Sequence, residues 1–225
     1  MIFEDRKHAG QKLAEALISY RGRDVVVYAL PRGGVVIGAE VARSLDAPLD
    51  LIVTRKIGHP LSPEYAIAAV DEDGNTVTNP IEIESIDRKW FEQEVEIEQR
   101  EAQRRRVLYT SGRNPVSATD KVAILVDDGL ATGLTMFAAI QQARKQHPRR
   151  VIVAIPVAPP QTVRKLRLLA DEVVALYTPE PFGAIGSFYL RFDQVSDAEV
   201  VELMRSIPPP MLSGGVVSSP RSSSR

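Results

Sequence analysis

Two hydrophobic patterns alternate along most of the chain. Short apolar runs predict buried strands at residues 24–30, 49–54, 122–126, 151–155 and 173–176. Between them, apolar residues spaced three or four apart predict helices at 6–20, 35–45, 136–145 and 161–169, and a last helix follows at 198–204. Strands that alternate with helices predict an α/β fold with a parallel sheet covered by helices on both faces.

The alternation is interrupted between about residues 55 and 120, where we expect an insert. Residues 65–70 and 76–78 flank an Asp-Gly pair, and this arrangement predicts a hairpin. Residues 83–107 predict a long charged helix with an acidic start and a narrow apolar stripe. It ends in Arg104-Arg105-Arg106, which predicts a solvated helix end or, if the insert acts as a lid, a contact with a bound anion.

The length of 225 residues suits one domain with a small subdomain. We expect a single domain over residues 1–206, in which about 178–195 form a small C-terminal hood. Residues 207–225 are rich in proline, serine and glycine, which predicts a flexible tail.

Composition and charge exclude several classes of protein. The chain has no cysteine, so it has neither disulfides nor thiolate metal sites. A net charge of −1 argues against a partner that is nucleic acid or a membrane surface. No apolar run reaches the length of a membrane span, and the first residues do not resemble a signal peptide. We therefore expect a cytoplasmic protein.

The segment after the predicted strand at 122–126 has the most specific chemistry. The strand ends in Asp127 and Asp128, and Thr132-Gly133-Leu134-Thr135 then leads into a helix. A glycine-containing turn at a helix start presents backbone N–H groups and the positive end of the helix dipole to an anion. The acid pair adds acceptors for sugar hydroxyls or hydrated metal, so the segment predicts a sugar phosphate site. The plainer alternative is a capped helix after an ordinary strand.

Pro31-Arg32-Gly33-Gly34 also lies between a strand and a helix. Its glycines allow the backbone to approach an anion closely, and Arg32 can add a charge-assisted bond; the alternative is a tight turn. Ligands of parallel sheets bind at the carboxyl ends of the strands, so we expect this loop and the acid pair to share one site. Arg55 and Lys56 follow the next strand and could neutralise a leaving group, unless they are a solvated pair. We favour Lys56, because Arg55 is expected to face the opposite side.

The strand, acid pair and turn that end at Thr135 resemble the signature of the type I phosphoribosyltransferases, which bind 5-phosphoribosyl 1-pyrophosphate (PRPP). The resemblance implies a Rossmann-like fold with the helical and hairpin insert and the hood. It implies that Asp127 and Asp128 contact the ribose hydroxyls and, with Lys56, act in catalysis. The residues implied to bind the 5′-phosphate are Ala131, Thr132, Gly133, Leu134 and Thr135, and those implied to bind pyrophosphate are Arg32, Gly33, Gly34, Arg55 and Lys56.

The implied activity is transfer of the 5-phosphoribosyl group from PRPP to a nitrogenous acceptor, with release of pyrophosphate. A nucleobase is the favoured acceptor. Mg²⁺ is the implied cofactor, held through PRPP and water near Asp127 and Asp128 without a direct protein ligand. A homodimer is common in the family. The alternative is a non-catalytic regulator of the same fold that binds PRPP or a nucleotide.

The motifs narrow the group within the family without naming the acceptor. Pro-Arg-Gly-Gly, Arg-Lys-Ile-Gly and Val-Asp-Asp-Gly-x-Ala-Thr-Gly are similar to a bacterial group whose acceptor is unsettled, and adenine phosphoribosyltransferases carry similar Arg-Lys-x-Gly and Ala-Thr-Gly-x-Thr-Met segments. Ala131 stands where enzymes for 6-oxopurines often have aspartate, which counts against hypoxanthine or guanine. The adenine enzymes place a glutamate in a mobile region, a role open to Glu64 or Glu72.

Aromatic residues in the predicted hood are candidates for contacts with the base. Phe182 and Tyr189 follow the last predicted strand among several glycines, and the resemblance implies a base-covering segment at this point. The alternative is that these rings cap the edge of the core.

The segment that begins at Asp71 has competing interpretations. It resembles the motif of haloacid-dehalogenase-like phosphatases, in which Asp71 would be the nucleophile. It also resembles a calcium loop, but Thr76 stands where that loop requires glycine. A hairpin turn explains the segment most simply.

Overall fold

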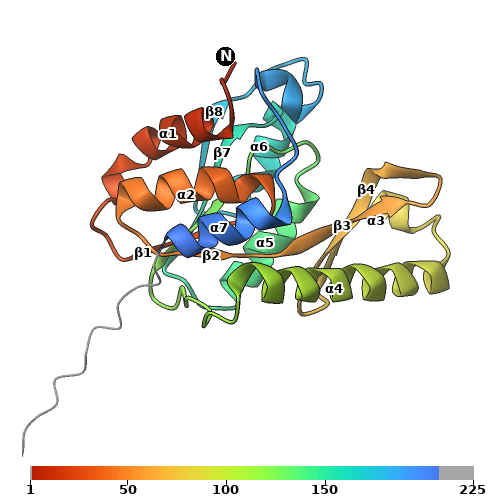
Figure 1. Cartoon of the computed structure of the whole chain (residues 1–225). Coiled ribbons are helices and arrows are strands. Elements are labelled where there is room, and N and C mark those ends of the chain that lie inside the picture. The colour runs from red at the N-terminus through yellow and green to blue at the C-terminus, as the bar shows by residue number, and fades with distance from the viewer. Residues whose placement is uncertain (1, 208–225) are drawn as a thin grey trace, which may run out of the picture.

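The centre of the protein is a five-stranded parallel sheet, seen in a computed structural model that describes residues 2–207 (Figure 1). Its order is β2-β1-β6-β7-β8, and its strands are β1 (Val25–Ala29), β2 (Leu49–Leu51), β6 (Val122–Val126), β7 (Arg150–Val157) and β8 (Glu172–Tyr177). The neighbours β1 and β6 are in register from Val25 opposite Val122 to Ala29 opposite Val126. Both strands therefore end at the same level of the sheet.

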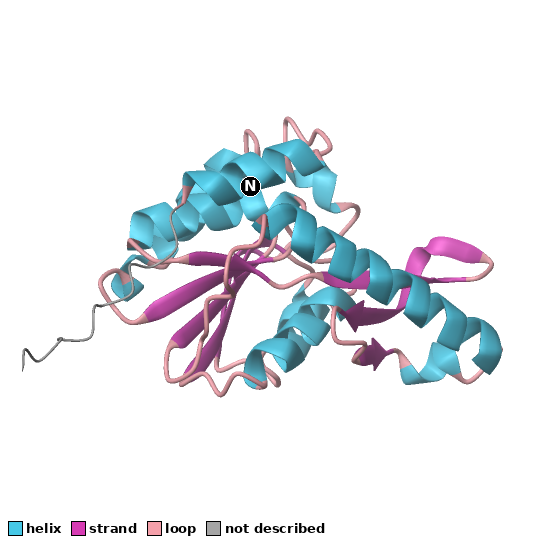
Figure 2. Cartoon of the chain, turned by 60° about the horizontal axis from the view of Figure 1, so that its bottom comes forward, coloured by secondary structure: helices cyan, strands magenta, loops and turns pink. Residues whose placement is uncertain are grey.

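Helices cover both faces of this sheet, as the alternating pattern predicted (Figure 2). One layer contains α1 (Arg6–Ala16), α2 (Gly33–Leu45) and α7 (Asp197–Ser206), and the other contains α5 (Leu134–Arg144) and α6 (Pro160–Leu166). Two short 3₁₀ helices, η1 (Ile18–Tyr20) and η2 (Ile185–Phe188), complete the main body. Because β1 and β6 are buried on both faces, their sequences are unbroken apolar runs.

The insert forms a second, antiparallel sheet that projects from the main body (Figure 1). It consists of β3 (Thr54–His59), β4 (Ser62–Asp71) and β5 (Thr76–Thr78), with the helices α3 (Pro80–Ile83) and α4 (Arg88–Thr110). The predicted hairpin is confirmed, since β4 pairs with β5 across the turn. Asp71 is 1% exposed and accepts hydrogen bonds from the backbone of Asp73 and Asn75, so its place in the structure is that of a turn residue.

Two predicted elements of the insert are divided in the structure. The strand expected at 49–54 is two strands, because the chain leaves the central sheet after Leu51 and enters the second sheet at Thr54. The long helix expected at 83–107 is α3 followed by α4. The side chain of Asp87 accepts a hydrogen bond from Trp90 N at 2.8 Å and caps α4. The first turn of α4 contains no acidic residue, in contrast to the predicted acidic start.

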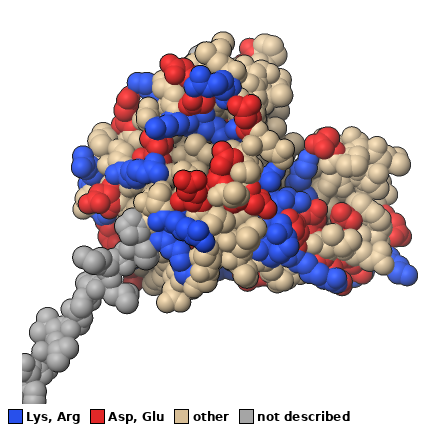
Figure 3. Space-filling view, viewed as in Figure 1, with Lys and Arg blue, Asp and Glu red and all other residues tan. Residues whose placement is uncertain are grey.

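Most of the predicted tail lies outside the described residues, but Ile207 is buried at the edge of the core. Lysine, arginine, aspartate and glutamate side chains are interspersed over the face in Figure 3, as the net charge of −1 suggests.

Within the described residues, every helix is too short or too polar to cross a membrane.

A buried ion pair fastens the insert to the central sheet. Arg106 of α4 donates to Asp50 of β2 through two nitrogens, at 2.8 and 3.1 Å, and Asp50 is 4% exposed. Arg106 also donates to Leu51 O, and Val116 N donates to Asp50. Neither interpretation of the arginine cluster describes Arg106, which is neither a solvated helix end nor free to contact an anion.

Arg106→Met should destabilise the fold by about 3 kcal/mol, because it leaves the Asp50 carboxylate buried without its partner. Denaturant unfolding at neutral pH measures this loss. Arg100→Met is the matched control, since Arg100 pairs with Glu96 on the exposed side of the same helix. That change should cost less than about 0.5 kcal/mol. Equal losses in the two variants would contradict the anchoring role of Arg106.

Glu72 connects the insert to α5 with an incomplete set of hydrogen bonds. Gln142 Nε2 donates to Glu72 Oε1 at 3.3 Å, while Glu72 Oε2 and Gln142 Oε1 are buried without a hydrogen-bond partner within the described chain. Arg106 Nε lies 4.0 Å from Glu72 Oε2. Burial raises the pKa of Glu72, and the charge of Arg106 opposes this rise only in part. The carboxyl is therefore easier to bury protonated than ionised.

Glu72→Gln should stabilise the fold near pH 7 by about 1 kcal/mol, because an amide removes the buried charge and can donate to Gln142 Oε1. The raised pKa means that the penalty is absent below the usual value of 4.5 and develops as pH rises through the folded-state pKa. The gain should thus vanish at about pH 4 in thermal unfolding. The control is Glu202→Gln, at an exposed position of α7. A gain that is the same at both pH values would refute the explanation.

Candidate functional site

The two glycine-containing loops meet where β1 and β6 end. Leu30 N donates to Val126 O at 2.9 Å, which joins the start of one loop to the start of the other. A Cβ on Gly33 would clash with Asp128 Oδ2, and one on Gly34 would lie 2.9 Å from Val126 O. Both positions therefore need glycine for close approach, as the sequence suggested for an anion-binding loop.

The acid pair lies directly over this junction. Asp128 N donates to Asp127 Oδ1 at 2.8 Å, and Arg6 Nε donates to Asp128 Oδ2 at 2.7 Å. Burial raises the pKa of both carboxyls, and the charge of Asp128 raises the pKa of Asp127 further. Arg6 opposes both rises. Within the described chain, the second oxygen of each carboxylate has no hydrogen-bond partner, so each can accept a bond from a ligand.

The turn after the acid pair ends at an open helix N-terminus. Gly133 has φ of +83° and is the N-cap of α5, without a side chain that bonds to the first-turn amides. Those N–H groups and the helix dipole are available to an anion. The side chain of Thr132 is exposed beside them and that of Thr135 is half-buried. The turn thus has the donors expected of a phosphate site.

A cavity of about 590 Å³ lies over the acid pair and the turn. One wall is the loop, including Asp127, Asp128 and all of the residues expected to bind the 5′-phosphate: Ala131, Thr132, Gly133, Leu134 and Thr135. The insert contributes a second wall with Lys56, Glu64 and Tyr65, and the hood contributes a third with Ile185 and Phe192. The structure therefore brings the acid pair, the phosphate turn and Lys56 around one space.

The two arginines expected near pyrophosphate have side chains directed elsewhere. Arg32 Nη1 lies 3.3 Å from Asp197 Oδ1 on α7, and Arg55 Nε lies 2.7 Å from Glu98 Oε2 on α4. Neither side chain lines the cavity, and Gly33 and Gly34 do not line it either. Their loop adjoins the site through the close contact between Gly33 and Asp128. The interpretation that Arg55 faces away from Lys56 agrees with this placement.

Lys56 and Glu64 form an ion pair at the mouth of the cavity. Lys56 Nζ lies 2.8 Å from Glu64 Oε2, and the hydrogen bond from Lys56 lowers the pKa of Glu64. Of the two glutamates left open by the sequence, Glu64 lines the cavity, whereas Glu72 packs against α5 and α4.

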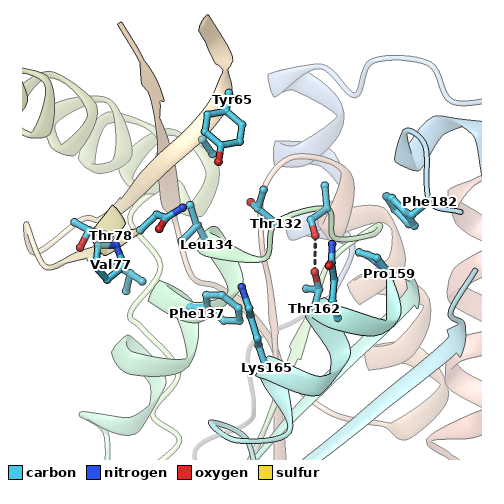
Figure 4. A pocket seen from close by; sticks show the side chains of 15 residues that line it. Tyr65, Val77, Thr78, Thr132, Leu134, Phe137, Pro159, Thr162, Lys165 and Phe182 are labelled. Atoms are coloured by element: carbon cyan, nitrogen blue, oxygen red, sulfur yellow. Dashed lines mark hydrogen bonds between the residues drawn. The ribbon is translucent and has the colours of Figure 1, made fainter. Parts of the chain in front are cut away.

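The two aromatic residues of the hood have different places, and that of Tyr189 matches the alternative of a ring at the edge of the core. Tyr189 is buried, and its hydroxyl donates to Asp128 O at 2.6 Å, so it supports the acid pair from behind. Phe182 lines a neighbouring cavity of about 480 Å³ with Thr132, Phe137 and Lys165 (Figure 4). Sequence spacing could not show this arrangement, because it depends on the parallel bridge between Phe3 and Tyr189.

Several side chains at the site were missed by the sequence analysis, and one of them is Tyr65 in the insert wall. Ile185 and Phe192 line the main cavity in place of the two predicted aromatic residues. Arg6 bonds to Asp128 from the first turn of α1. Its position in an ordinary amphipathic helix carries no signal, because the contact joins residues 122 positions apart.

Comparisons with known proteins identify similar sequences and structures. Residues 3–177 match the family model described as phosphoribosyl transferase domain. Two proteins of Mycobacterium tuberculosis, each named "putative phosphoribosyl transferase", are 42% identical over 210 residues and match 90% of this chain. The chain spans about half of their length, at 46%.

Solved structures share the fold. The crystal structure of the TT1426 protein from Thermus thermophilus is 42% identical with a TM-score of 0.77, and the match covers 92% of this chain and 99% of that one. The AQ2163 protein from Aquifex aeolicus shares the fold alone, at 12% identity with a TM-score of 0.50, over 80% of this chain and 78% of that one.

Gly33→Ala should destabilise the protein by about 1–3 kcal/mol, because the added methyl group displaces the Asp128 side chain from its place beside Arg6. Denaturant unfolding measures the change. Gly183→Ala is the control, since the nearest atom to its added Cβ, Ser187 Oγ, is 4.0 Å away. If both variants unfold at the same denaturant concentration as the parent protein, the close contact at Gly33 is not a constraint.

Proposed function

The chain belongs to the phosphoribosyl transferase domain family, and from this membership we propose that it transfers the 5-phosphoribosyl group of PRPP to a nitrogenous acceptor and releases pyrophosphate. The observation that carries the proposal is that the acid pair and the open N-terminus of α5 line one cavity. A ligand with hydroxyls and a phosphate a few bonds apart matches both features.

In this proposal each part of PRPP has a complementary part of the cavity. The 5′-phosphate binds the turn from Ala131 to Thr135, where backbone amides and two hydroxyls can donate. The ribose hydroxyls donate to the free oxygens of Asp127 and Asp128. The pyrophosphate lies toward the backbone at Gly33 and Gly34. Lys56 approaches the pyrophosphate from the insert, if its ion pair with Glu64 opens.

The reaction breaks the bond between ribose C1 and the pyrophosphate oxygen and forms a bond from C1 to a nitrogen of the acceptor. Positive charge develops on the ribose in the transition state, and the carboxylates of Asp127 and Asp128 favour it electrostatically. Lys56 favours the negative charge of the departing pyrophosphate. Glu64, in the same cavity wall, is our candidate to take the proton that the acceptor nitrogen releases.

The acid pair also fits the magnesium ion that the family implies. Mg²⁺ keeps several waters and is usually bound by one or two carboxylates together with substrate phosphates. Within the described residues, no three His, Asp or Glu side chains are grouped to hold a metal. Asp127 and Asp128 would contact the ion through water, with PRPP supplying the remaining oxygens. When bound, the ion offsets charge on the leaving pyrophosphate.

The hood wall supports a flat acceptor such as a nucleobase. Ile185 packs over Gly129, where a Cβ would lie 2.6 Å from Ile185 Cγ2, and Phe192 lies beside it in the cavity wall. Apolar surfaces bind planar heterocycles by burial of apolar area, and the part of the Phe192 ring not covered by the Arg6 guanidinium adds to that surface. In the loop wall, Ala131 provides no carboxylate, which counts against a 6-oxopurine acceptor.

The test is nucleotide formation, detected by mass spectrometry, with PRPP, Mg²⁺ and a panel of purines, pyrimidines and small amines. We expect one product at its nucleotide mass. The double change Asp127→Asn and Asp128→Asn should lower its rate of formation by about two orders of magnitude, because neutral amides lose the electrostatic stabilisation of the ribosyl charge.

Asp73→Asn, in the exposed turn of the hairpin, is the matched control and should keep the parental rate. PRPP binding without any product would favour the regulator of the same fold. Failure to bind PRPP would contradict both functions.

A further inference from the structure

Arg6, which lies outside the family motifs, contacts the acid pair. Arg6 lies in the first turn of α1, and its side chain is 12% exposed beside an Asp128 side chain that is 14% exposed. Its Nε is 2.8 Å from the place that a Gly33 Cβ would occupy. Arg6 therefore sits at the junction of the two phosphate loops.

Arg6 is held in this place by three contacts. Its Nε donates to Asp128 Oδ2 at 2.7 Å, and its Nη1 donates to Asp193 O at 2.7 Å. Its guanidinium carbon lies 3.7 Å from the ring centroid of Phe192, a cation–π geometry. A guanidinium bonded on two sides and stacked on a ring has one preferred orientation.

The contacts of Arg6 also connect the hood to the acid pair. Asp193 and Phe192 belong to the segment after the hood helix η2, and Phe192 lines the cavity. Tyr189 of the same segment donates to the backbone oxygen of Asp128. Asp128 is thus fixed at its side chain through Arg6 and at its backbone through Tyr189. Asp127 has no such support beyond its bond from Asp128 N within the described residues.

As a result, the two carboxylate oxygens of Asp128 have different surroundings. Oδ2 is occupied by Arg6, and Oδ1 has no hydrogen-bond partner in the part of the chain that the structure describes. An oxygen fixed in advance accepts a ligand hydroxyl without a further loss of side-chain freedom, which is the benefit of preorganisation. A freely rotating carboxylate would lose that freedom on binding.

We propose that Arg6 is a positioning residue for the sugar: by holding Oδ2 of Asp128, it presents Oδ1 to a ribose hydroxyl. This inference rests on the proposed function, since it takes the ribose of PRPP as the ligand of the acid pair. Arg6 acts through Asp128 and does not itself bind the pyrophosphate. The two roles differ in which fragment of PRPP they affect.

The test is isothermal titration of PRPP with Mg²⁺, and of ribose 5-phosphate and pyrophosphate without added Mg²⁺, because in the proposed site the ion would join pyrophosphate to Asp128 through water. Arg6→Met should weaken PRPP and ribose 5-phosphate about tenfold, as expected when one charge-assisted contact no longer orients an acceptor. Pyrophosphate affinity should be unchanged, because that ligand has no hydroxyl for Asp128. Arg6→Lys keeps a cation without the fork geometry and should recover part of the loss.

Arg191→Met is the matched control. Arg191 pairs with Asp5 at 2.7 Å and joins the same two segments, but its side chain is 66% exposed and makes no contact with Asp128. This variant should bind all three ligands like the parent protein. If it loses affinity as Arg6→Met does, the effect comes from the general attachment of the hood and the proposal is wrong.

The remaining outcomes are also decisive. An equal loss of pyrophosphate affinity in Arg6→Met would make Arg6 a direct ligand and overturn the proposal, as would unchanged affinity for ribose 5-phosphate. If Arg6→Met fails to fold, Arg6→Lys decides by the same comparison of ribose 5-phosphate with pyrophosphate. A parent protein that binds none of the three ligands would refute the proposed function itself, which is a different result from equal binding by parent and variant.

Discussion

The contact between the ends of β1 and β6 is the constraint on which the site depends. These strands are neighbours in register, so the loops that follow them emerge at one place and compete for the same space. Both loops fit only because residue 33 is glycine, since a side chain at this position would collide with Asp128. The acid pair and the open N-terminus of α5 can then line one cavity while the loop at Gly33 packs closely against Asp128.

The other walls of the cavity come from parts of the chain that are attached separately. The insert carries Lys56 and Glu64 and is fastened by the pair between Asp50 and Arg106, which lie on either side of these two residues in the sequence. The hood carries Ile185 and Phe192, and is tied through Arg6 to the acid pair. The acid pair and the turn thus form a fixed floor of the cavity, and the insert and the hood form two walls that are attached separately. This arrangement suits the proposed transfer, which must admit two substrates and exclude water.

Much of the fold could be predicted from the sequence, because buried strands and amphipathic helices leave strong local patterns. The acid pair and the turn from Ala131 to Thr135 were also visible, since an anion site at a helix start is encoded in consecutive residues. The directions of most side chains could not be predicted from the sequence. Arg32 turns to a carboxylate on α7 and Tyr189 turns inward to Asp128, whereas Arg55 faces away from Lys56 as expected. These choices depend on packing between segments that are distant in sequence, which periodicity does not record.

The pairing of the N-terminal segment with the hood has a consequence for how the site is made. Phe3 N donates to Phe188 O, and Leu190 N donates to Phe3 O, so the first residues described are joined to some of the last. During synthesis the two glycine-containing loops can form as soon as β6 and α5 have emerged. Arg6 cannot donate to Asp193 O in the hood until residue 193 has also been made. The cavity is therefore completed only after residue 193 has emerged, and a shorter nascent chain should have an incomplete site with its acid pair exposed.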